Sequence, residues 1–458
     1  MKSYFVEIAL LNQGWAKNVR VSVSENGIIQ DVETDQALSA DDICLSDKVL
    51  LPAPTNLHSH GFQRALAGLT EYRSGSSNDS FWTWRTLMYK FLEQLTPEQF
   101  TAINAYAQME MLEAGYASLA EFHYVHNQKD GTKYDNPAEL SDCVIEAASK
   151  SGIGLTLLPV YYAQGGVDGR PLQGGQLRFK NNLESYEQIW GHASQTAKYA
   201  REDFKLGIAP HSLRALSETD LVALAQTYSD VPKHIHIAEQ LAEIDEIKAA
   251  YGKRPVEWLL EKVDVGPDWC LVHATHLTET ENSDLAKSGA IAGLCPITEA
   301  NLGDGIFPAV SFLKANGKIG VGTDSNVSIS LVHELRMLEY SQRLQLKGRA
   351  LLCDANKSTG RTLFDKTLEG GAQAAGRYCG KIAPGFQADF MTLNMKSDDL
   401  ADLQGDYLLD SWIFASKDNL VEDVFSAGHH VVQNGQHIEA EKIISDFRTV
   451  MKELRSTL

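Results

Sequence analysis

The stretch Leu57-His58-Ser59-His60 places two histidines two positions apart at the end of a short apolar run. Alternate side chains of an extended strand point the same way, so both imidazoles can reach one metal ion. Such a pair also occurs in core strands and surface loops, and alone it does not identify a metal site. The stretch becomes informative because comparable polar residues follow other apolar runs of the chain.

Eight short apolar runs, separated by amphipathic stretches, occupy the middle of the sequence. This alternation is typical of βα units around a parallel sheet. Eight units predict an α/β fold in which the strands close into a (β/α)8 TIM barrel. The runs lie near residues 49–54, 118–122, 154–160, 206–209, 234–238, 271–274, 290–294 and 319–322.

Residues that can carry chemistry follow the carboxyl ends of these runs, where barrel active sites are built from βα loops. Residues 234–239 read His-Ile-His-Ile-Ala-Glu, the sixth run leads to His273 and His276, and the eighth leads to Asp324. A third imidazole and a carboxylate are therefore available beside the first histidine pair. Four such elements at strand ends arise by chance far less easily than one, so they predict a metal site.

Both ends of the chain are predicted to be rich in β-structure. Val19, Val21 and Val23 alternate with polar residues before a tight turn at 25–27, and a similar pattern precedes Asn434-Gly435. We therefore expect a small β-sandwich domain formed by both ends, and an amphipathic helix after it. The expected regions are 1–49 and 381–440 for the small domain, 50–380 for the barrel and 441–458 for the C-terminal helix.

One helix between the strands has clear sequence signals at both ends. Thr96 is suited to be its N-cap, Pro97 to its first turn, and Gln99 to a capping box with Thr96. Gly115 is suited to end it. A strand is expected to follow directly.

Composition limits the class of protein and of partner. The 458 residues are 43% hydrophobic and 22% charged, which is ordinary for a globular protein with a large core. The net charge of −19 opposes a nucleic-acid or anionic-membrane partner, although a few arginines in a cleft can still bind a small anion. The first residues lack the pattern of a signal peptide, and the six cysteines form no C-x-x-C pair. We therefore expect a soluble, cytoplasmic protein.

Longer motifs resemble the amidohydrolase superfamily, most closely those members that act on N-formimino-L-glutamate in histidine breakdown. The resemblance covers nearly the whole chain. Two small departures are Gly61, where alanine is usual, and Thr323, where serine is frequent, and neither removes a reacting group. The motifs are residues 56–60, 62–65, 81–85, 120–124, 209–214, 298–305 and 324–328.

The resemblance implies that one zinc ion per chain is held by four residues. Three neutral imidazoles and one carboxylate suit a borderline divalent ion and can lower the pKa of a bound water to about 7. Binuclear members have a bridging lysine at the end of the fourth strand, but residues 209–211 here read Ala-Pro-His, which favours one ion. The implied ligands are His58, His60, His236 and Asp324.

The resemblance also implies the roles of the reacting and binding residues. Glu239 would be the proton shuttle and His273 an additional acid or base, with Asp324 counted among the catalytic residues as well as the ligands. Two arginines suit a substrate with two carboxylates, because each guanidinium can bind one of them bidentately. The implied substrate-binding residues are Gln63, Arg85, Tyr124, His211 and Arg214.

The expected activity is hydrolysis of a non-peptide carbon–nitrogen bond: N-formimino-L-glutamate would give N-formyl-L-glutamate and ammonia. The resemblance further suggests a homodimer. Two alternatives are a deaminase of an aromatic base on the same barrel and a scaffold protein that has lost catalysis. The arginine pair argues against the first, and the complete ligand set with Glu239 argues against the second. We expect His234 to be an inner-barrel or supporting residue, and the sequence assigns no role to His126 or His276.

Overall fold

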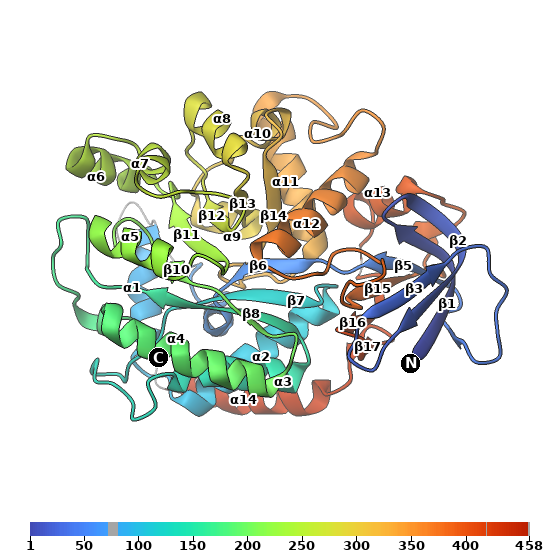
Figure 1. The fold of residues 1–458 in the computed structure, drawn as a ribbon, viewed down its shortest axis with the longest axis horizontal. Coiled ribbons are helices and arrows are strands. Elements are labelled where there is room, and N and C mark those ends of the chain that lie inside the picture. The colour runs from blue at the N-terminus through green and yellow to red at the C-terminus, as the bar shows by residue number, and fades with distance from the viewer. Residues whose placement is uncertain (72–80, 418, 457–458) are drawn as a thin grey trace.

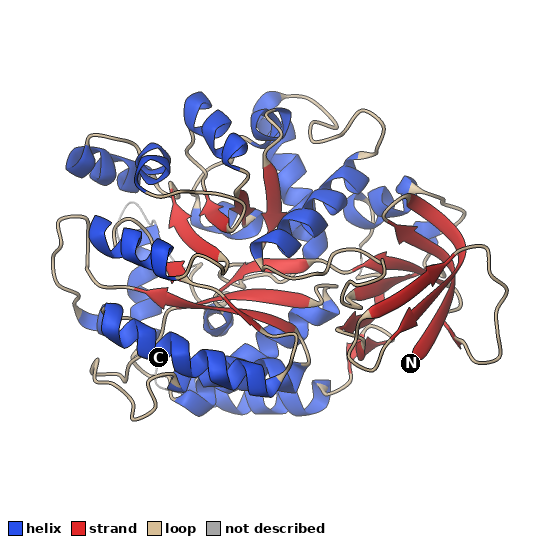
Figure 2. Ribbon diagram, in the orientation of Figure 1, coloured by secondary structure: helices blue, strands red, loops and turns tan. Residues whose placement is uncertain are grey.

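A computed structural model describes residues 1–71, 81–417 and 419–456 of the chain. A barrel of strands and helices forms the larger part, and a twisted β-sheet that contains the N-terminus lies at its side (Figure 1). Figure 2 shows that helices surround the barrel strands, whereas the lateral part consists mainly of strands. Among the described helices, none has the length and apolar character needed to cross a bilayer.

The barrel is built from parallel strands that form two sheets. Single bridges connect these sheets at both junctions, Ser59 with Asp324 and Ser212 with His236. The connections confirm the expected α/β barrel, with two very short strands, β9 and β10, sharing the fourth position. The strands are β6 (Thr55–Ser59), β7 (Ser118–His123), β8 (Gly154–Tyr161), β9 (Lys205–Leu206), β10 (Ala209–Pro210), β11 (Lys233–Ile237), β12 (Trp269–His273), β13 (Ile291–Leu294) and β14 (Lys318–Val321).

The run at 49–54 does not form the first barrel strand, contrary to the sequence-based prediction. Its residues belong to β5 (Lys48–Pro52), which pairs with β1 (Lys2–Leu11) and β15 (Phe390–Asn394) in the small sheet. The first barrel strand is β6, which begins three positions after Pro52. Both strands are almost entirely buried, so the apolar run continues across the boundary between two sheets.

Helices follow most barrel strands and cover the outside of the barrel. The capping box of Thr96 and Gln99 forms as predicted at the start of α2, and Gly115 follows the helix with a positive φ of 100°. The helices are α1 (Phe81–Leu92), α2 (Pro97–Glu113), α3 (Glu139–Ser151), α4 (Leu183–Ala200), α5 (Glu218–Thr227), α6 (Leu241–Tyr251), α7 (Pro255–Lys262), α8 (Glu279–Ser288), α9 (Pro296–Leu302), α10 (Ala309–Lys314), α11 (Leu331–Leu346) and α12 (Thr359–Ala374), with short 3₁₀ helices at Gly61–Leu66 and Gly174–Arg178.

The small β region joins strands from both ends of the chain. Its nine strands form one continuous sheet in the order β18-β17-β16-β15-β5-β1-β2-β3, with β4 paired to β1. Residues far apart in sequence, such as Tyr4, Val21 and Phe390, share its own buried core. The remaining elements are β2 (Gly14–Val23), β3 (Ile29–Glu33), β4 (Ile43–Cys44), β16 (Val421–Ser426), β17 (His429–Gln433), β18 (Gln436–His437), the 3₁₀ helix Asp398–Leu400 and α13 (Asp406–Phe414).

The last described helix, α14 (Ala440–Arg455), packs against the barrel. Its Ile443 shares a core cluster with Met109 of α2 and Ala147 of α3. Phe447 stacks on Tyr106 with 3.9 Å between the ring centroids. The amphipathic pattern of the C-terminal segment therefore indicated this helix correctly.

Candidate active site

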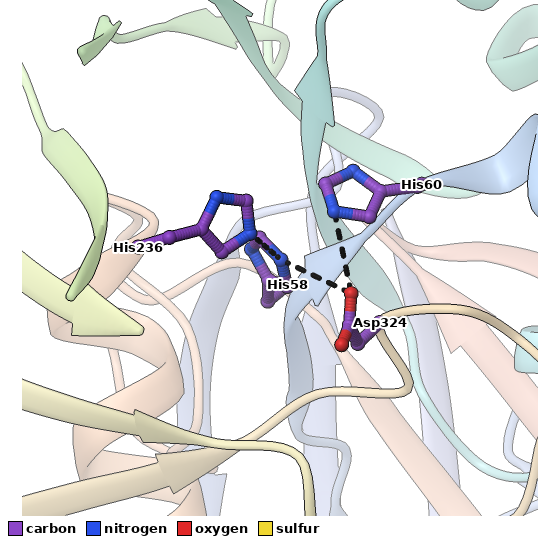
Figure 3. Close-up of side chains that lie close together, drawn as sticks. All are labelled: His58, His60, His236 and Asp324. Atoms are coloured by element: carbon purple, nitrogen blue, oxygen red, sulfur yellow. Dashed lines mark hydrogen bonds and ion pairs between the residues drawn. The ribbon is translucent and has the colours of Figure 1, made fainter. Parts of the chain in front are cut away.

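Three imidazoles and one carboxylate converge where β6, β11 and β14 end. Asp324 Oδ1 lies 3.4 Å from His58 Nε2 and 3.3 Å from His60 Nε2. The Nε2 atoms of His236 and His58 are 3.1 Å apart. Figure 3 shows the four side chains turned toward one another, with His58 and His60 coming from the same stretch of chain. One ligand atom from each residue lies within 4.8 Å of the others, so the group can hold a metal ion.

Backbone carbonyls fix the orientation of two of these rings. His60 Nδ1 lies 2.9 Å from the Phe122 carbonyl oxygen, and His236 Nδ1 lies 3.2 Å from that of His211. A carbonyl oxygen can only accept, so each Nδ1 carries the proton and each Nε2 keeps a lone pair. This arrangement is the usual one for imidazoles that bind a metal.

Burial makes the charges of these groups depend on one another. Burial lowers the pKa of His58 to about 3, although Asp324 acts in the opposite direction. Burial alone would raise the pKa of Asp324, but the hydrogen bond and charge of His58, together with His273, hold it well below its usual range. Neutral imidazoles beside an ionised carboxylate are the protonation states that a divalent cation requires.

The backbone is strained where the strands end at this group. Ala238, His273 and Asp324 have φ values of 53°, 68° and 45°, which residues with a side chain rarely adopt. Such conformations persist only where the surrounding structure enforces them, and they cluster at functional sites. Here the bonds from His60 N to Asp324 O and from Asp324 N to His58 O, both 2.9 Å, tie the last strand to the first.

The departures at Gly61 and Thr323 fit their surroundings. A Cβ atom at position 61 would lie 2.1 Å from the side-chain oxygen of Asn104, so an alanine there would require the Asn104 side chain to move. The Gly61 amide donates to Glu121 at 2.6 Å, which fixes the turn after His60. The Thr323 hydroxyl accepts from Asn56 at 2.7 Å, a contact that a serine hydroxyl can also make.

Glu239 lies just beyond β11 and is 5% exposed. Burial raises its pKa, while His273 and Arg214 act in the opposite direction. Its backbone amide and that of Ala238 donate to the carboxylate of Glu243, each at 3.2 Å. These bonds hold the loop that carries Glu239 against the start of α6.

His273, the last residue of β12, lies between two carboxylates. Its Nε2 is 3.8 Å from Asp324 Oδ2, and its Nδ1 is 3.3 Å from Glu299 Oε1. Burial lowers its pKa, but Glu239, Glu299 and Asp324 together outweigh that effect and raise the pKa to about 10. The sequence analysis did not single out Glu299, because only the position of α9 brings it to His273.

The predicted binding residues line the same cavity as three of the predicted ligands, His60, His236 and Asp324. Gln63 donates to the Tyr124 hydroxyl at 2.6 Å, and both side chains are buried. Arg214, at 8% exposure, reaches the cavity from the loop after β10. All five predicted binding residues are therefore brought together, namely Gln63, Arg85, Tyr124, His211 and Arg214.

Two tyrosines in this cavity were not predicted. Tyr162 receives a hydrogen bond of 3.1 Å from Arg85 Nη2, and Tyr89 receives one from Arg85 Nε. Both hydroxyls thus help to orient Arg85. Tyr89 lies four positions after Arg85 on α1, so helical spacing could have indicated its contact; Tyr162 follows a different strand and carried no such signal.

The remaining histidines near the barrel differ in their surroundings. His234 Nε2 lies 2.8 Å from the Ala374 carbonyl oxygen and His126 Nε2 lies 2.9 Å from that of Val160, which are structural contacts. Burial lowers the pKa of His276. A second group that can hold a metal, His273, Cys295 and Asp324, shares Asp324 with the first.

Comparisons with known proteins agree with this geometry. The amidohydrolase family profile matches residues 49–431, and the profile of the N-terminal domain of the formimidoylglutamate deiminase HutF matches residues 1–43. The chain is 48% identical to formimidoylglutamate deiminase of Pseudomonas aeruginosa, over 99% of this chain and 100% of that protein. It is 27% identical to 5'-deoxyadenosine deaminase of Methanopyrus kandleri, over 95% and 94% of the two chains.

Solved structures resemble the whole chain. An amidohydrolase from Brucella melitensis superimposes with a TM-score of 0.94 at 44% identity, covering 99% of this chain and 100% of the other. An adenosine deaminase from Xanthomonas campestris shares the fold at 20% identity, with a TM-score of 0.82 over 99% and 98% of the chains. The fold of the chain is therefore that of solved amidohydrolase structures.

Proposed function

Since the chain belongs to the amidohydrolase family and carries the N-terminal domain of formimidoylglutamate deiminases, we propose that it hydrolyses N-formimino-L-glutamate to N-formyl-L-glutamate and ammonia. The relative from Pseudomonas aeruginosa, aligned over nearly the full length, supports this substrate. The cavity supports it independently, because it holds both a metal-type donor group and two arginines.

We propose zinc, one ion per chain, held by His58, His60, His236 and Asp324. The donor set fits, since imidazole nitrogens and carboxylate oxygens are the ligands by which proteins bind zinc. When bound, such an ion acts as a Lewis acid and lowers the pKa of water to about 7. The carbonyl bonds of His60 and His236 prepare the site, because they keep the Nε2 lone pairs directed inward.

Glu239 is the proposed proton carrier. It accepts a proton as water attacks the formimino carbon, and it returns that proton to the nitrogen that leaves as ammonia. Burial, which raises the pKa of Glu239, makes it a better base than an exposed carboxylate. The bonds that the loop amides donate to Glu243 keep Glu239 in place. His273 orients and polarises the tetrahedral intermediate.

Recognition of the substrate's glutamate portion rests on Arg85 and Arg214. Each guanidinium can bind one carboxylate through two parallel hydrogen bonds. The tyrosines at positions 89 and 162 restrict Arg85, which lowers the entropy cost of using it. An aromatic base lacks the two carboxylates that these arginines suit.

The observation that carries the proposal is the presence of both arginines in the cavity that is lined by three of the four metal-type ligands, His60, His236 and Asp324. Zinc-loaded protein should release ammonia from N-formimino-L-glutamate and leave guanine, cytosine and adenosine unchanged. If the protein turned over any of these three compounds faster than N-formimino-L-glutamate, deamination of an aromatic base would replace the proposed function. We further expect a cytoplasmic homodimer, for which sedimentation should give twice the mass of one chain.

A further inference from the structure

Glu299 lies close to the reacting groups but does not line the cavity that the substrate would occupy. It comes from α9, within the motif at 298–305 that the proposed function leaves without a role. The Oε1 atom of Glu299 lies 3.3 Å from His273 Nδ1. On the other side of the ring, Asp324 Oδ2 lies 3.8 Å from His273 Nε2. The two carboxylates thus face opposite nitrogens of one imidazole.

We propose that Glu299 is a positioning residue for His273: its carboxylate accepts the Nδ1–H and thereby holds the ring with Nε2 directed to the reaction. This inference rests on the proposed function for its kinetic consequence. The hydrogen bond between Nδ1–H and Glu299 can persist in both charge states of the imidazole, and the partner of one ring nitrogen fixes the role of the other. With Glu299 accepting at Nδ1, Nε2 is the nitrogen that exchanges protons or hydrogen bonds with the reacting atoms.

Glu299 can position another residue because it is itself held at both ends. Its Oε1 also accepts from the Cys295 amide at 2.8 Å, where α9 begins. At the other end, the Asp304 amide donates to the Glu299 carbonyl at 2.9 Å, and Gly303 caps the helix with a φ of 73°. Glu299 is only 5% exposed, so water competes little for its contact with His273.

The backbone of His273 gives a reason for such a device. Its φ of 68° is unfavourable for a residue with a side chain, and the next residue, Ala274, has a φ of 47°. A ring on a strained backbone at a strand end needs a second attachment to keep one orientation. Glu299 provides that attachment from a neighbouring unit of the barrel.

The test compares Glu299→Leu and Glu299→Gln in the zinc-loaded protein. Leucine removes the acceptor, and we expect kcat to fall by about 10- to 100-fold. KM should change by less than about twofold, because Glu299 does not contribute to the cavity wall. Glutamine retains an acceptor oxygen and should recover most of the lost kcat. A rise in KM with kcat unchanged would overturn the proposal.

Nitrogen NMR of histidine-labelled, zinc-loaded protein provides a readout that needs no substrate. The His273 signals are assigned by their loss in His273→Gln. We expect the Nδ1 proton to be hydrogen-bonded and protected from exchange with water in the wild type and in Glu299→Gln, and to lose that protection in Glu299→Leu. Identical His273 signals in wild type and Glu299→Leu would overturn the proposal even if the protein turned out to act on a different substrate.

Glu334→Gln is the matched control for a purely structural effect. Glu334 of α11 is a fully buried carboxyl. It supports α9, the helix that carries Glu299, by accepting from the Ile297 amide at 3.0 Å. Burial raises its pKa well above the usual range, so the amide replaces a neutral acid of similar shape. We expect wild-type kcat and wild-type His273 signals. If this variant reproduced the changes seen in Glu299→Leu, general support of α9 would explain them and the specific role of Glu299 would fail.

Discussion

The Nε2 atoms of His58 and His236 lie 3.1 Å apart although the two residues are 178 positions apart in the chain. Because His236 Nδ1 contacts a carbonyl oxygen, its Nε2 carries a lone pair that points toward the other ring. This nitrogen, the His58 nitrogen beside it and the nearby Asp324 carboxylate form an arrangement that a shared cation stabilises. The proposed zinc ion meets this need directly.

We predict that the purified protein carries about one zinc per chain and that a chelator abolishes turnover. Removing the ion should also lower the thermal midpoint, because the buried Asp324 carboxylate loses its positive partner. Elemental analysis and calorimetry measure both effects, and added zinc should reverse them. Two tightly held ions per chain, or full activity without metal, would contradict the prediction.

Glu239→Gln should keep the metal and the fold but nearly abolish turnover, since the amide has the same shape and cannot carry a proton. Elemental analysis and steady-state kinetics on the same preparation separate these effects. The matched control is Glu279→Gln, which changes an exposed glutamate at the start of α8 and should leave kcat unaltered. Near-normal turnover in Glu239→Gln would remove this residue from the mechanism.

Replacing Arg85 or Arg214 by methionine should lower kcat/KM while leaving the bound metal unchanged. Loss of one charge-assisted contact is worth roughly 1.5–3 kcal/mol, which corresponds to a fall of about tenfold to a hundredfold or more. Lysine keeps the charge but loses the bidentate geometry, and should recover part of the loss. Arg170→Met, which alters an exposed arginine paired with Asp168, is the control.

A substrate analogue that lacks one carboxylate tests the same two arginines further. The analogue should be poor with the wild type, yet it should lose less than the full substrate does in one of the two methionine variants. That difference identifies which arginine recognises which carboxylate. Wild-type efficiency of both variants on both compounds would show that the arginines do not bind the substrate.

The chain shows both what sequence patterns can predict and where they fail. The helix cap at Thr96 and Gln99 forms as expected, because capping depends on residues three positions apart. The four residues predicted as metal ligands lie together at strand ends, a placement that alternation along a strand and the polarity of barrel loops could indicate as local signals. The pairing of β5 with β15 was missed, since it joins residues more than three hundred positions apart across a continuous apolar run. The contact of Glu299 with His273 likewise depends on how α9 turns beside β12, which no local pattern encodes.

Stability should depend on pH through Asp423 in the small sheet. Burial alone would raise the pKa of Asp423, but hydrogen bonds from His430 and Lys48 hold it at about 2. A carboxyl whose pKa is lower in the folded state than its unfolded value of about 4 stabilises the protein above that value. This contribution is lost as the pH falls from about 4 to 2.

Asp423→Asn should therefore lower the free energy of unfolding at pH 7 by about 1–3 kcal/mol, and the difference from wild type should shrink toward pH 2. Urea denaturation at a series of pH values measures it. Asp41→Asn, at an exposed position, should leave stability nearly unchanged at every pH. A difference for Asp423→Asn that stays constant down to pH 2 would refute the ionic contribution.

Identification of the products tests the central claim most directly. Water that attacks the formimino carbon can in principle expel either of its two nitrogens, and the proposed proton delivery by Glu239 selects the terminal one. Incubation of zinc-loaded protein with N-formimino-L-glutamate, followed by mass spectrometry and ammonia determination, should give N-formyl-L-glutamate and ammonia in equal amounts. Formamide with free glutamate, or no products from fully metal-loaded protein, would contradict the account.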